Sequence, residues 1–559
     1  MSDSDSNVTR RRFLQTTIAA AGASALPFDR LAAAALPFGG MGAAAKTAAK
    51  YTRYSVTSLE GQRALVSYAR GVQAMLDLPA TDPRNWFRNA FIHLMDCPHG
   101  NWWFYVWHRG YLGYLEQTIR TLSEDPCFAM PFWDWTELPQ IPNAMFNGVL
   151  TPSDVAYAPY TGNLAVFTSF IQPALQDYWS KLSAAQLAQL SLRGYTTFDL
   201  MWNDVTGNNV SGNVAYANPC AARYLTRDNP KLNGPTGFDV SPFVVRAGLM
   251  VRAFNVPQVG LSFTSLKTKS HNAQPAKFSF SILEGFPHNK VHNYIGGVGP
   301  LDPGPYGSMT NFLSPVDPIF FLHHSNMDRL WDVWARKQIG LGLPFLPTGA
   351  DLADLSNEPF LFYANDTGGY VGPSNAGKYL STEAFDYNYG PGFGEAFVHP
   401  PKALLAGRAM SPVTGTVKGN TATLALPADA VKNHLDPDLA SSLVVEITVS
   451  RPSAASPGRE FDVFIGEQQD ATQTGVDNPN YAGTAAFFGN MSHMDGMAAE
   501  ATFAVPLPRS SAVFRNLQAL NSTQLTIRIV PSPDRGQKGG LLKSAPKAPV
   551  LKSVVVRTQ

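Results

Sequence analysis

The sequence predicts two folded parts: a mainly helical domain with long loops over residues 50–395, and an all-β sandwich or barrel over residues 415–559. The first prediction rests on apolar residues at helical spacing, clearest in residues 59–76 and 103–122. The second rests on short runs rich in Val, Ile and Thr that Pro, Gly, Asn and Asp separate. Residues 396–414 are the expected linker.

Each expected element has recognisable ends. Ser58 precedes the first helical run and Pro79 follows it closely, so this helix should begin after Ser58 and end before Pro79. A further helix is expected over residues 323–337, and residues 150–280 should mix helical pieces with polar loops. The strands are expected in TATLALPAD, SSLVVEITVS, REFDVFIGEQ, ATFAVPLP, QLTIRIVPSP and LKSVVVRTQ.

Composition narrows the classes of partner. The chain has 559 residues, long enough for a sizeable core, with 45% hydrophobic and 15% charged residues and a net charge of +1. This charge balance indicates neither a nucleic acid nor an electrostatic membrane partner. Three cysteines, Cys97, Cys127 and Cys220, are too few for a disulfide framework. A bridge between Cys127 and Cys220 and a pair of buried thiols both remain open.

The first 35 residues are expected to be a signal peptide. Residues 9–15 read TRRRFLQ and precede the small apolar run TIAAAGASAL, with Ala-x-Ala cleavage sites at 23–25 and 33–35. Paired arginines followed by Phe and Leu indicate a twin-arginine signal, hence the twin-arginine export machinery as partner and a periplasmic or secreted location. The alternative is a basic amphipathic start of a cytosolic protein. The apolar run is too short for a membrane span, and no other stretch approaches one.

Six of the eleven histidines form two separated triplets. The first is His93, His99 and His108, and the second is His288, His292 and His324. Imidazole is a good ligand for copper and zinc, and three neutral imidazoles leave a coordination position open for an exogenous ligand. Two such sites facing each other would form a dinuclear centre with room for dioxygen. The triplets therefore indicate oxygen chemistry.

The spacing of the second triplet suits a shared metal. His288 and His292 are four residues apart, so on a helix both rings project from one face, and Pro287 is a good helix-start residue. His323 and His324 are adjacent and point in different directions on a helix, so only one should reach the metal. Isolated histidines are usually structural, and one such pair occurs by chance or binds zinc. Two triplets in aromatic surroundings arise by chance much less often.

The stretches CPHGNWWFYVWHRGYL, PHNKVHNYIGG and DPIFFLHHSNMDRLW resemble the two copper-binding signatures of the tyrosinase, catechol oxidase and haemocyanin superfamily. The resemblance implies a four-helix bundle around two copper ions, a type-3 centre with O2 as co-substrate and phenolic small molecules as substrates. It assigns His93, His99 and His108 to the first copper, and His288, His292 and His324 to the second. His323 would then contact a ligand or lie near the substrate.

The resemblance implies further roles. Cys97 and His99 match a cysteine and a histidine that are joined by a thioether in some members. Glu284 and Asn289 match a pair that holds a water which deprotonates monophenols. Asp328 would support a ligand imidazole, or else form a salt bridge with an arginine such as Arg109.

Two structural roles follow from the same comparison. Residues 387–389, Tyr-Asn-Tyr, resemble the tyrosine motif that closes the catalytic core. Phe312 or Leu313 would be a bulky gate above the first copper.

Three classes compete for this pattern: a phenol oxidase, an oxygen carrier and a zinc hydrolase. A zinc hydrolase should show a carboxylate near the histidines, which neither triplet does, and carriers form large assemblies or repeats. Among these classes we expect the phenol oxidase, for which the resemblance implies oxidation of monophenols to o-diphenols and of o-diphenols to o-quinones. A catechol or aminophenol oxidase with little monophenolase activity is the alternative, and homo-oligomerisation is left open.

The β domain resembles the carboxy-terminal domain of plant polyphenol oxidases, which shields the copper entrance in latent enzymes. It is expected to pack over the active site as a lid. Residues 491–497, MSHMDGM, have soft ligands that could instead deliver Cu(I), or could simply pack well.

Overall fold

A computed structural model describes the chain with gaps. The described residues are 49–206, 223–232, 238–273, 275, 277–297, 307–399, 410–436, 442–450, 460–466, 478–488, 500–520, 522–532 and 549–559. The signal expected in residues 1–35, Cys220 and residues 491–497 lie outside them. The chain divides into two units, Met1–Lys50 and Tyr51–Gln559, and the second holds every element and site that follows.

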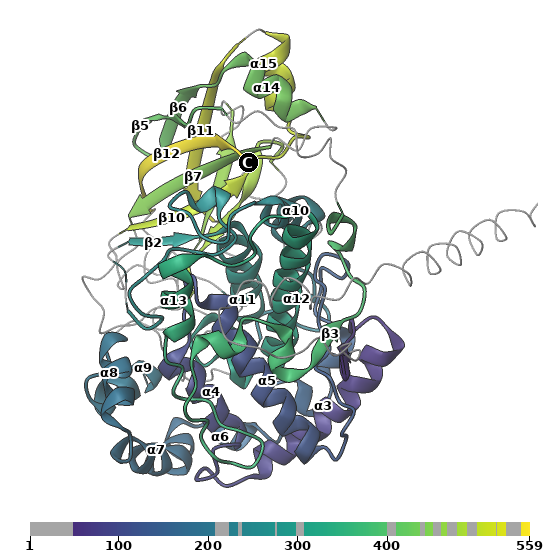
Figure 1. Ribbon diagram of the computed structural model, residues 1–559, viewed down its shortest axis with the longest axis vertical. Helices are drawn as coiled ribbons and strands as arrows, with labels where there is room; N and C mark the ends of the chain where they lie inside the picture. Colours follow the sequence, from purple (N-terminus) through teal and green to yellow (C-terminus); the bar gives the residue numbers. More distant parts are fainter. Residues whose placement is uncertain are drawn as a thin grey trace, which may run out of the picture. The chain divides into compact units, whose positions relative to one another are not determined.

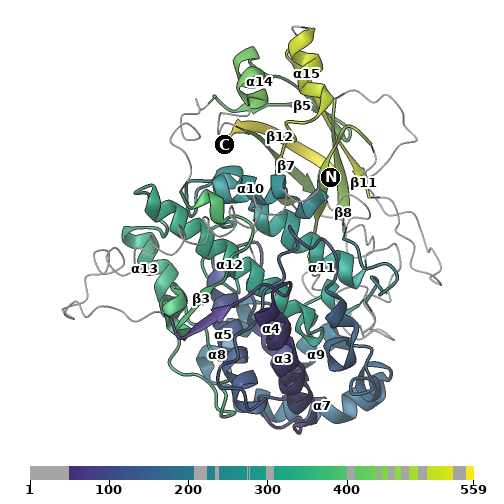
Figure 2. The ribbon, with the colours of Figure 1, turned by 90° about the vertical axis from the view of Figure 1, so that its right-hand side faces the viewer.

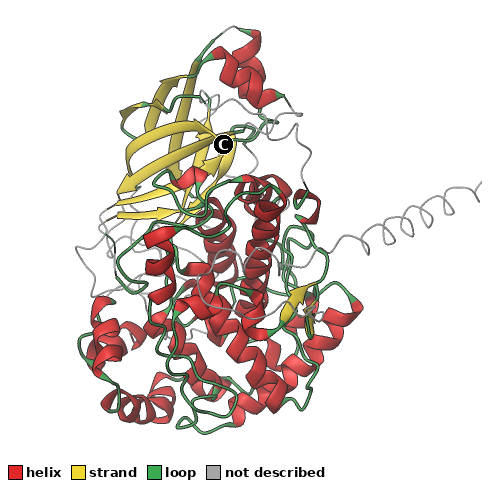
Figure 3. Ribbon diagram, viewed as in Figure 1, coloured by secondary structure: helices red, strands yellow, loops and turns green. Residues whose placement is uncertain are grey.

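The described residues between 51 and 399, here called the helical part, are mainly helix and loop (Figures 1 and 3). The three predicted helices are present as α3, α5 and α12. As predicted, the Ser58 hydroxyl caps α3 by accepting the Gly61 N–H at 3.0 Å. The helices are α3 (Leu59–Asp77), α4 (Trp86–Asp96), α5 (Phe104–Leu122), α6 (Ala158–Thr161), α7 (Leu164–Ser180), α8 (Ala184–Leu192), α9 (Phe198–Thr206), α10 (Pro242–Met250), α11 (Asn289–Gly296), α12 (Ile319–Gly340) and α13 (Gly349–Asn357).

The described residues from 410 onward, here called the β part, form most of two five-stranded sheets, ordered β2-β10-β7-β12-β4 and β5-β6-β11-β8-β9. Every predicted strand is present. The strands are β4 (Val413–Thr414), β5 (Thr416–Lys418), β6 (Thr421–Ala425), β7 (Leu443–Ser450), β8 (Glu460–Ile465), β9 (Tyr481–Ala486), β10 (Glu500–Pro506), β11 (Gln524–Pro531) and β12 (Val550–Thr558).

The two sheets share one apolar core, as in a sandwich. Ile447 of β7 and Ile527 of β11 belong to the same buried cluster although they lie in different sheets. Two helices that the sequence did not predict, α14 (Ala428–Leu435) and α15 (Ala512–Ala519), lie side by side next to the strands in both views (Figures 1 and 2). Their contact includes the rings of His434 and Phe514, 4.4 Å apart.

One strand of the first sheet comes from the helical part. β2 (Lys277–Phe280) pairs in parallel with β10, with Phe280 opposite Phe503. The two rings stack at 5.1 Å. Only mixed helix and loop was predicted here, because KFSF is too short for its period to show. The helical part and the β part are therefore joined by a shared ladder of strands.

A short parallel ladder closes the helical part near residue 390. β1 (Tyr51–Arg53) pairs with β3 (Tyr387–Tyr389), the predicted tyrosine motif. The Tyr387 hydroxyl donates to Asp328, and the Tyr389 hydroxyl donates to the same carboxylate at 2.5 Å. This arrangement agrees with a structural role for the motif.

Asp328 is the centre of a buried ion network. Its carboxylate accepts from Arg109 Nε at 2.7 Å and from Arg53 Nη1 at 3.2 Å, and Arg53 also donates to Glu116 at 2.8 Å. Of the two predicted roles, the salt bridge with Arg109 is the one present. No imidazole is among the hydrogen-bond partners of Asp328 in the described part of the chain, because arginines and tyrosines occupy its oxygens.

We predict that Asp328→Ala lowers the free energy of unfolding by about 3–5 kcal/mol, because two arginines would lose a buried counter-charge. Urea denaturation of the metal-free protein measures the change. Asp177→Ala is the control, since its ion pair with Lys181 is exposed and should contribute at most about 1 kcal/mol. Equal losses in both variants would contradict the prediction.

Candidate metal centre

The structure contains two groups of histidines. Within each group, one ring nitrogen of every member lies within 4.8 Å of those of the other members. All the predicted ligands are in these groups, and His323 is an additional member of the second. The groups are His93, His99 and His108, and His288, His292, His323 and His324.

The first group is built from two helices and the loop between them. His93 lies in the last turn of α4, His99 in the following loop, and His108 in the second turn of α5. The three ring centroids are 5.3 Å (His93 to His99), 5.6 Å (His93 to His108) and 5.4 Å (His99 to His108) apart. A nearly equilateral triangle of rings can surround a single ion.

Main-chain carbonyls set the tautomers of this group. His93 Nδ1–H donates to the Phe312 carbonyl at 2.8 Å, and His108 Nδ1–H donates to the Phe104 carbonyl at 2.7 Å. A carbonyl can only accept, so each neutral ring carries its proton on Nδ1 and its free lone pair on Nε2. The Nε2 atoms of His93, His99 and His108 are buried and have no hydrogen-bond partner among the described residues.

The second group follows a π-helical turn. Residues Glu284–His288 form that turn and lead directly into α11. Pro287 was predicted to start the helix but lies within the π turn, where the wider winding accommodates a residue that lacks an N–H. His288 and His292 still share a face, with ring centroids 4.6 Å apart.

His292 and His324 are placed to share an ion. His292 Nδ1–H donates to the Met309 carbonyl at 2.7 Å, which leaves a lone pair on Nε2. This atom lies 3.2 Å from His324 Nε2. Two nitrogens at tetrahedral positions, each about 2.0 Å from a metal, are about 3.3 Å apart. The observed separation fits two ligands of one ion.

His323 has the opposite tautomer. Its Nδ1 lies 3.1 Å from Trp135 Nε1, and an indole N–H can only donate. The neutral His323 ring therefore has its proton on Nε2, and its Nδ1 lone pair is occupied by the indole N–H, so neither nitrogen is free to bind a metal. This bond favours His324 over His323 as the ligand, as the resemblance implies. Trp135 was not singled out in the sequence, because its partner is distant in the chain.

The two groups face each other. The rings of His108 and His324 stack at 4.2 Å, and those of His99 and His288 are 5.5 Å apart. Burial lowers the pKa of all seven histidines, for His288 to about 3, so the rings are neutral near pH 7. A buried set of neutral nitrogen donors without a carboxylate fits copper.

Cys97 lies against His99 as the predicted crosslink requires. Its sulfur is 3.4 Å from His99 Nδ1, and the side chain is buried. Burial raises the pKa of the Cys97 thiol to about 12. By contrast, Cys127 is an exposed free thiol.

Glu284 and Asn289 are buried, and each makes two hydrogen bonds to other parts of the protein. Glu284 accepts from the Gly100 N–H at 2.6 Å and from the Ser265 hydroxyl. Asn289 Nδ2 donates to the Ala486 carbonyl at 2.8 Å, which orients Oδ1 to accept His288 Nδ1–H at 2.9 Å. No direct hydrogen bond joins Glu284 to Asn289 in the described structure. The amide is instead held by β9, which belongs to the β part.

The predicted gate region is occupied by two phenylalanines. Phe312 is buried with its ring 5.6 Å from that of His99, and Leu313 beside it is buried as well. Phe488, just after β9, lies 4.6 Å from His99 and 4.3 Å from His292, so it touches both groups. The sequence did not single out Phe488. Nothing in its Gly- and Ala-rich surroundings indicates that this Phe contacts histidines of the helical part.

A second buried network supports the first group from behind. His271 lies between Asp96, 2.9 Å from Nε2, and Glu358, 2.6 Å from Nδ1. Asp96 also accepts Trp107 Nε1–H at 2.8 Å, and the Trp107 ring is 5.0 Å from that of His108. Burial alone would lower the pKa of His271, but the two carboxylates outweigh it and raise that pKa to about 9.

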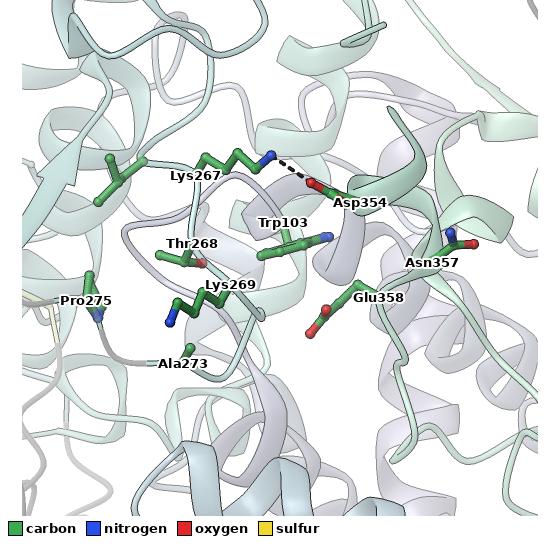
Figure 4. A pocket seen from close by; sticks show the side chains of 10 residues that line it. Trp103, Lys267, Thr268, Lys269, Ala273, Pro275, Asp354, Asn357 and Glu358 are labelled. Carbon is green, nitrogen blue, oxygen red and sulfur yellow. Dashed lines mark hydrogen bonds and ion pairs between the residues drawn. The ribbon is translucent and has the colours of Figure 1, made fainter. Parts of the chain in front are cut away.

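A cavity of about 970 Å³ opens at the outer end of this network (Figure 4). Its wall includes Glu358, Trp103 and Lys267, and Lys267 is paired with Asp354 at 2.8 Å. None of its lining residues is one of the seven histidines, so the cavity is separate from the candidate metal centre. Neither His271 nor this cavity was predicted, since nothing in the sequence links His271 to Asp96.

We predict that the His271 network makes stability depend on pH. A raised pKa in the folded state adds stability that is complete below the unfolded pKa near 6.5 and is lost as pH rises towards 9. The difference in unfolding free energy between the wild type and His271→Gln should shrink by about 3 kcal/mol between pH 6.5 and 9. Denaturant titrations at several pH values measure it. A difference that stays constant would contradict a charged His271.

Comparison with known proteins gives consistent results. The family model described as the common central domain of tyrosinase matches residues 76–337. Polyphenol oxidase II of Ipomoea batatas, named as chloroplastic, is 23% identical over 292 residues, which is 49% of this chain and 39% of the relative. (+)-Larreatricin hydroxylase of Larrea tridentata is 26% identical over 319 residues, 54% of this chain and 44% of the relative. The matched region thus spans less than half the length of these relatives.

The fold similarity extends further than the sequence match. A solved structure of recombinantly expressed latent aurone synthase, a polyphenol oxidase, has a TM-score of 0.54 and 19% identity, and covers 93% of this chain and 91% of that one. Both the helical part and the β part therefore have counterparts in one known fold. The central-domain match and the polyphenol oxidase relatives show that residues 76–337 are a central domain of the tyrosinase and polyphenol oxidase family of type-3 copper proteins.

Proposed function

We propose that this chain is a dicopper phenol oxidase. It would use O2 to hydroxylate monophenols to o-diphenols and to oxidise o-diphenols to o-quinones. The observation that carries the proposal is the pair of facing groups of buried, neutral imidazoles, whose closest rings, His108 and His324, stack at 4.2 Å. Phenolic small molecules are the proposed substrates.

Each copper ion would be held by three histidines. The proposed ligands of the first are His93, His99 and His108, and those of the second are His288, His292 and His324. When bound, a copper pair would supply two electrons at a time for the reduction of O2 and would be re-reduced by the phenolic substrate. The helices α4, α5, α11 and α12 carry four of the six ligands, and His288 directly precedes α11. We propose that these helices form the four-helix bundle of the family.

The surrounding residues would orient the substrate and exclude water. Phe312 and Phe488 give an apolar entrance, in which a phenol ring can pack edge-to-face. Glu284 would take the proton of a monophenol through a water that Asn289 orients. In the described conformation both side chains are bound elsewhere, which favours the second candidate, a catechol oxidase with little monophenolase activity.

The organisation of the chain is part of the proposal. Residues 1–35 would be the twin-arginine signal, 50–395 the dicopper domain, 396–414 the linker and 415–559 a lid. No described helix has the length and apolar character needed to cross a bilayer. The Cys97–His99 thioether is proposed on their 3.4 Å contact. Within the β part, the observation that supports a lid is the position of Phe488.

The ligand assignment can be tested with neighbouring histidines. We predict that His324→Ala removes about one copper ion per chain and abolishes catechol oxidation, because two imidazoles cannot hold the ion in the required geometry. His323→Ala should keep both ions, since its Nδ1 accepts from Trp135. Atomic absorption and the oxidation rate of a simple catechol measure both. Loss of copper in His323→Ala but not in His324→Ala would reverse the assignment.

The same measurements separate the competing classes. Two bound copper ions with reversible O2 binding but no catechol turnover would indicate an oxygen carrier. A purified chain that takes up zinc, and that shows no strong near-ultraviolet band after copper loading and addition of peroxide, would rule out the dicopper centre.

The lid can be tested at Phe488. We predict that Phe488→Ala raises kcat/KM for bulky catechols about tenfold and for unsubstituted catechol less, because the ring covers both histidine groups. Phe514→Ala is the matched control: it truncates a buried phenylalanine of the same β part, which packs on His434. An equal rise in both variants would show that loosening of the β part, and not removal of the ring, is responsible.

A further inference from the structure

Arg193 is a buried cation behind the loop that carries His99. It follows the last residue of α8, and only 2% of its surface is exposed. In the described part of the chain no carboxylate lies within ion-pair distance of its guanidinium. A buried arginine without a counter-ion is costly unless its donors are used, so its hydrogen bonds indicate what it is for.

The guanidinium binds the end of α4 at three points. Nε donates to the Leu94 carbonyl at 2.7 Å, and Nη1 donates to the Cys97 carbonyl at 2.6 Å. Nη2 donates to the Cys97 sulfur at 3.3 Å. The two carbonyls lie at the helix end, where main-chain acceptors lack helical partners and a positive charge is favourable.

The sulfur is held between Arg193 and His99. On one side it accepts from Nη2, and on the other it lies 3.4 Å from His99 Nδ1, the ring atom bonded to Cε1. The guanidinium is itself fixed, because it packs 4.9 Å from the Phe312 ring centroid and contacts the Asn272 amide oxygen at 3.3 Å. The planar fork therefore directs the Cys97 side chain at one edge of the imidazole.

We propose that Arg193 is a positioning residue for the Cys97–His99 thioether, holding the sulfur against the ring while the bond forms. In this step the S–H bond of Cys97 and a ring C–H bond of His99 are lost, and one S–C bond forms. The two electrons and two protons released reduce one O2, supplied at the copper pair, to hydrogen peroxide. The inference rests on the proposed dicopper function, because that function supplies the oxidant.

The test is the rate of crosslinking in the full chain. Metal-free wild type, Arg193→Lys and Arg193→Met are loaded with copper in air, and the tryptic peptide of residues 89–109 is followed by mass spectrometry. The crosslinked peptide is lighter by two hydrogens and its cysteine resists alkylation. We expect Arg193→Lys to slow crosslinking on the order of tenfold to a hundredfold and Arg193→Met at least as much. The three N–H groups of an ammonium leave a single nitrogen, whereas Arg193 reaches its acceptors from three separate nitrogens of a planar fork.

Arg88→Lys is the matched control. Arg88 is another buried arginine at α4, and it donates to the Ala80 and Ala174 carbonyls without touching Cys97. Copper content and thermal unfolding are measured for every variant, so that crosslinking is compared at equal loading and equal stability. Arg193→Lys supplies the comparison if Arg193→Met does not fold. Slow crosslinking in Arg193→Lys alone supports the inference.

Three results would overturn it. The first is crosslinking of Arg193→Lys at the wild-type rate, and the second is equal slowing of crosslinking in Arg88→Lys. The third is a wild type that binds two copper ions and oxidises catechol although its peptide does not lose the two hydrogens. The last result would leave the proposed function intact. A wild type that binds no copper would refute both proposals together.

Discussion

The candidate metal centre depends on hydrogen bonds that decide which nitrogen of each imidazole is free. A buried neutral histidine has one proton for two nitrogens, so a carbonyl at Nδ1 leaves Nε2 available to a metal. Phe104, Met309 and Phe312 provide such carbonyls. At His323 the indole N–H of Trp135 donates to Nδ1, so the proton of this ring lies on Nε2. His323 is thereby distinguished from its neighbour His324, whose Nε2 lies 3.2 Å from His292 Nε2.

These partners also explain the shape of the fold around the site. A carbonyl can point at an imidazole only if its own chain segment is held still, and here the segments are helix turns and short 3-10 turns with buried side chains. The ion network of Asp328 and the His271 network hold α5 and the end of α4 from outside. Burial of the rings in aromatic surroundings then keeps them neutral, so the fold supplies both the orientation and the protonation state that a metal requires.

The sequence predicted the helices, the strands and the histidine groups well, for particular reasons. α3, α5 and α12 have long apolar periods, and the strands β7 and β8 are dense in β-branched or aromatic residues. The histidines stand in long motifs of rare residues. Contacts between distant segments could not be predicted in this way: His271 with Asp96, Trp135 with His323, and Phe488 with His292 each join residues whose local sequence shows no sign of the partner. β2 was missed because four residues do not reveal a period.

The ladder between β2 and β10 has a consequence for how the proposed lid can move. β2 belongs to the helical part and contributes an edge to a sheet whose other strands belong to the β part. A cut in the connection between the two parts would therefore yield fragments that remain assembled through main-chain pairing and the packing of Phe280 on Phe503. Exposure of the histidines by proteolysis would require either dissociation of this edge or a local shift of the few residues around Phe488. The second route breaks far fewer contacts, so a nicked chain can become accessible while it still behaves as one particle.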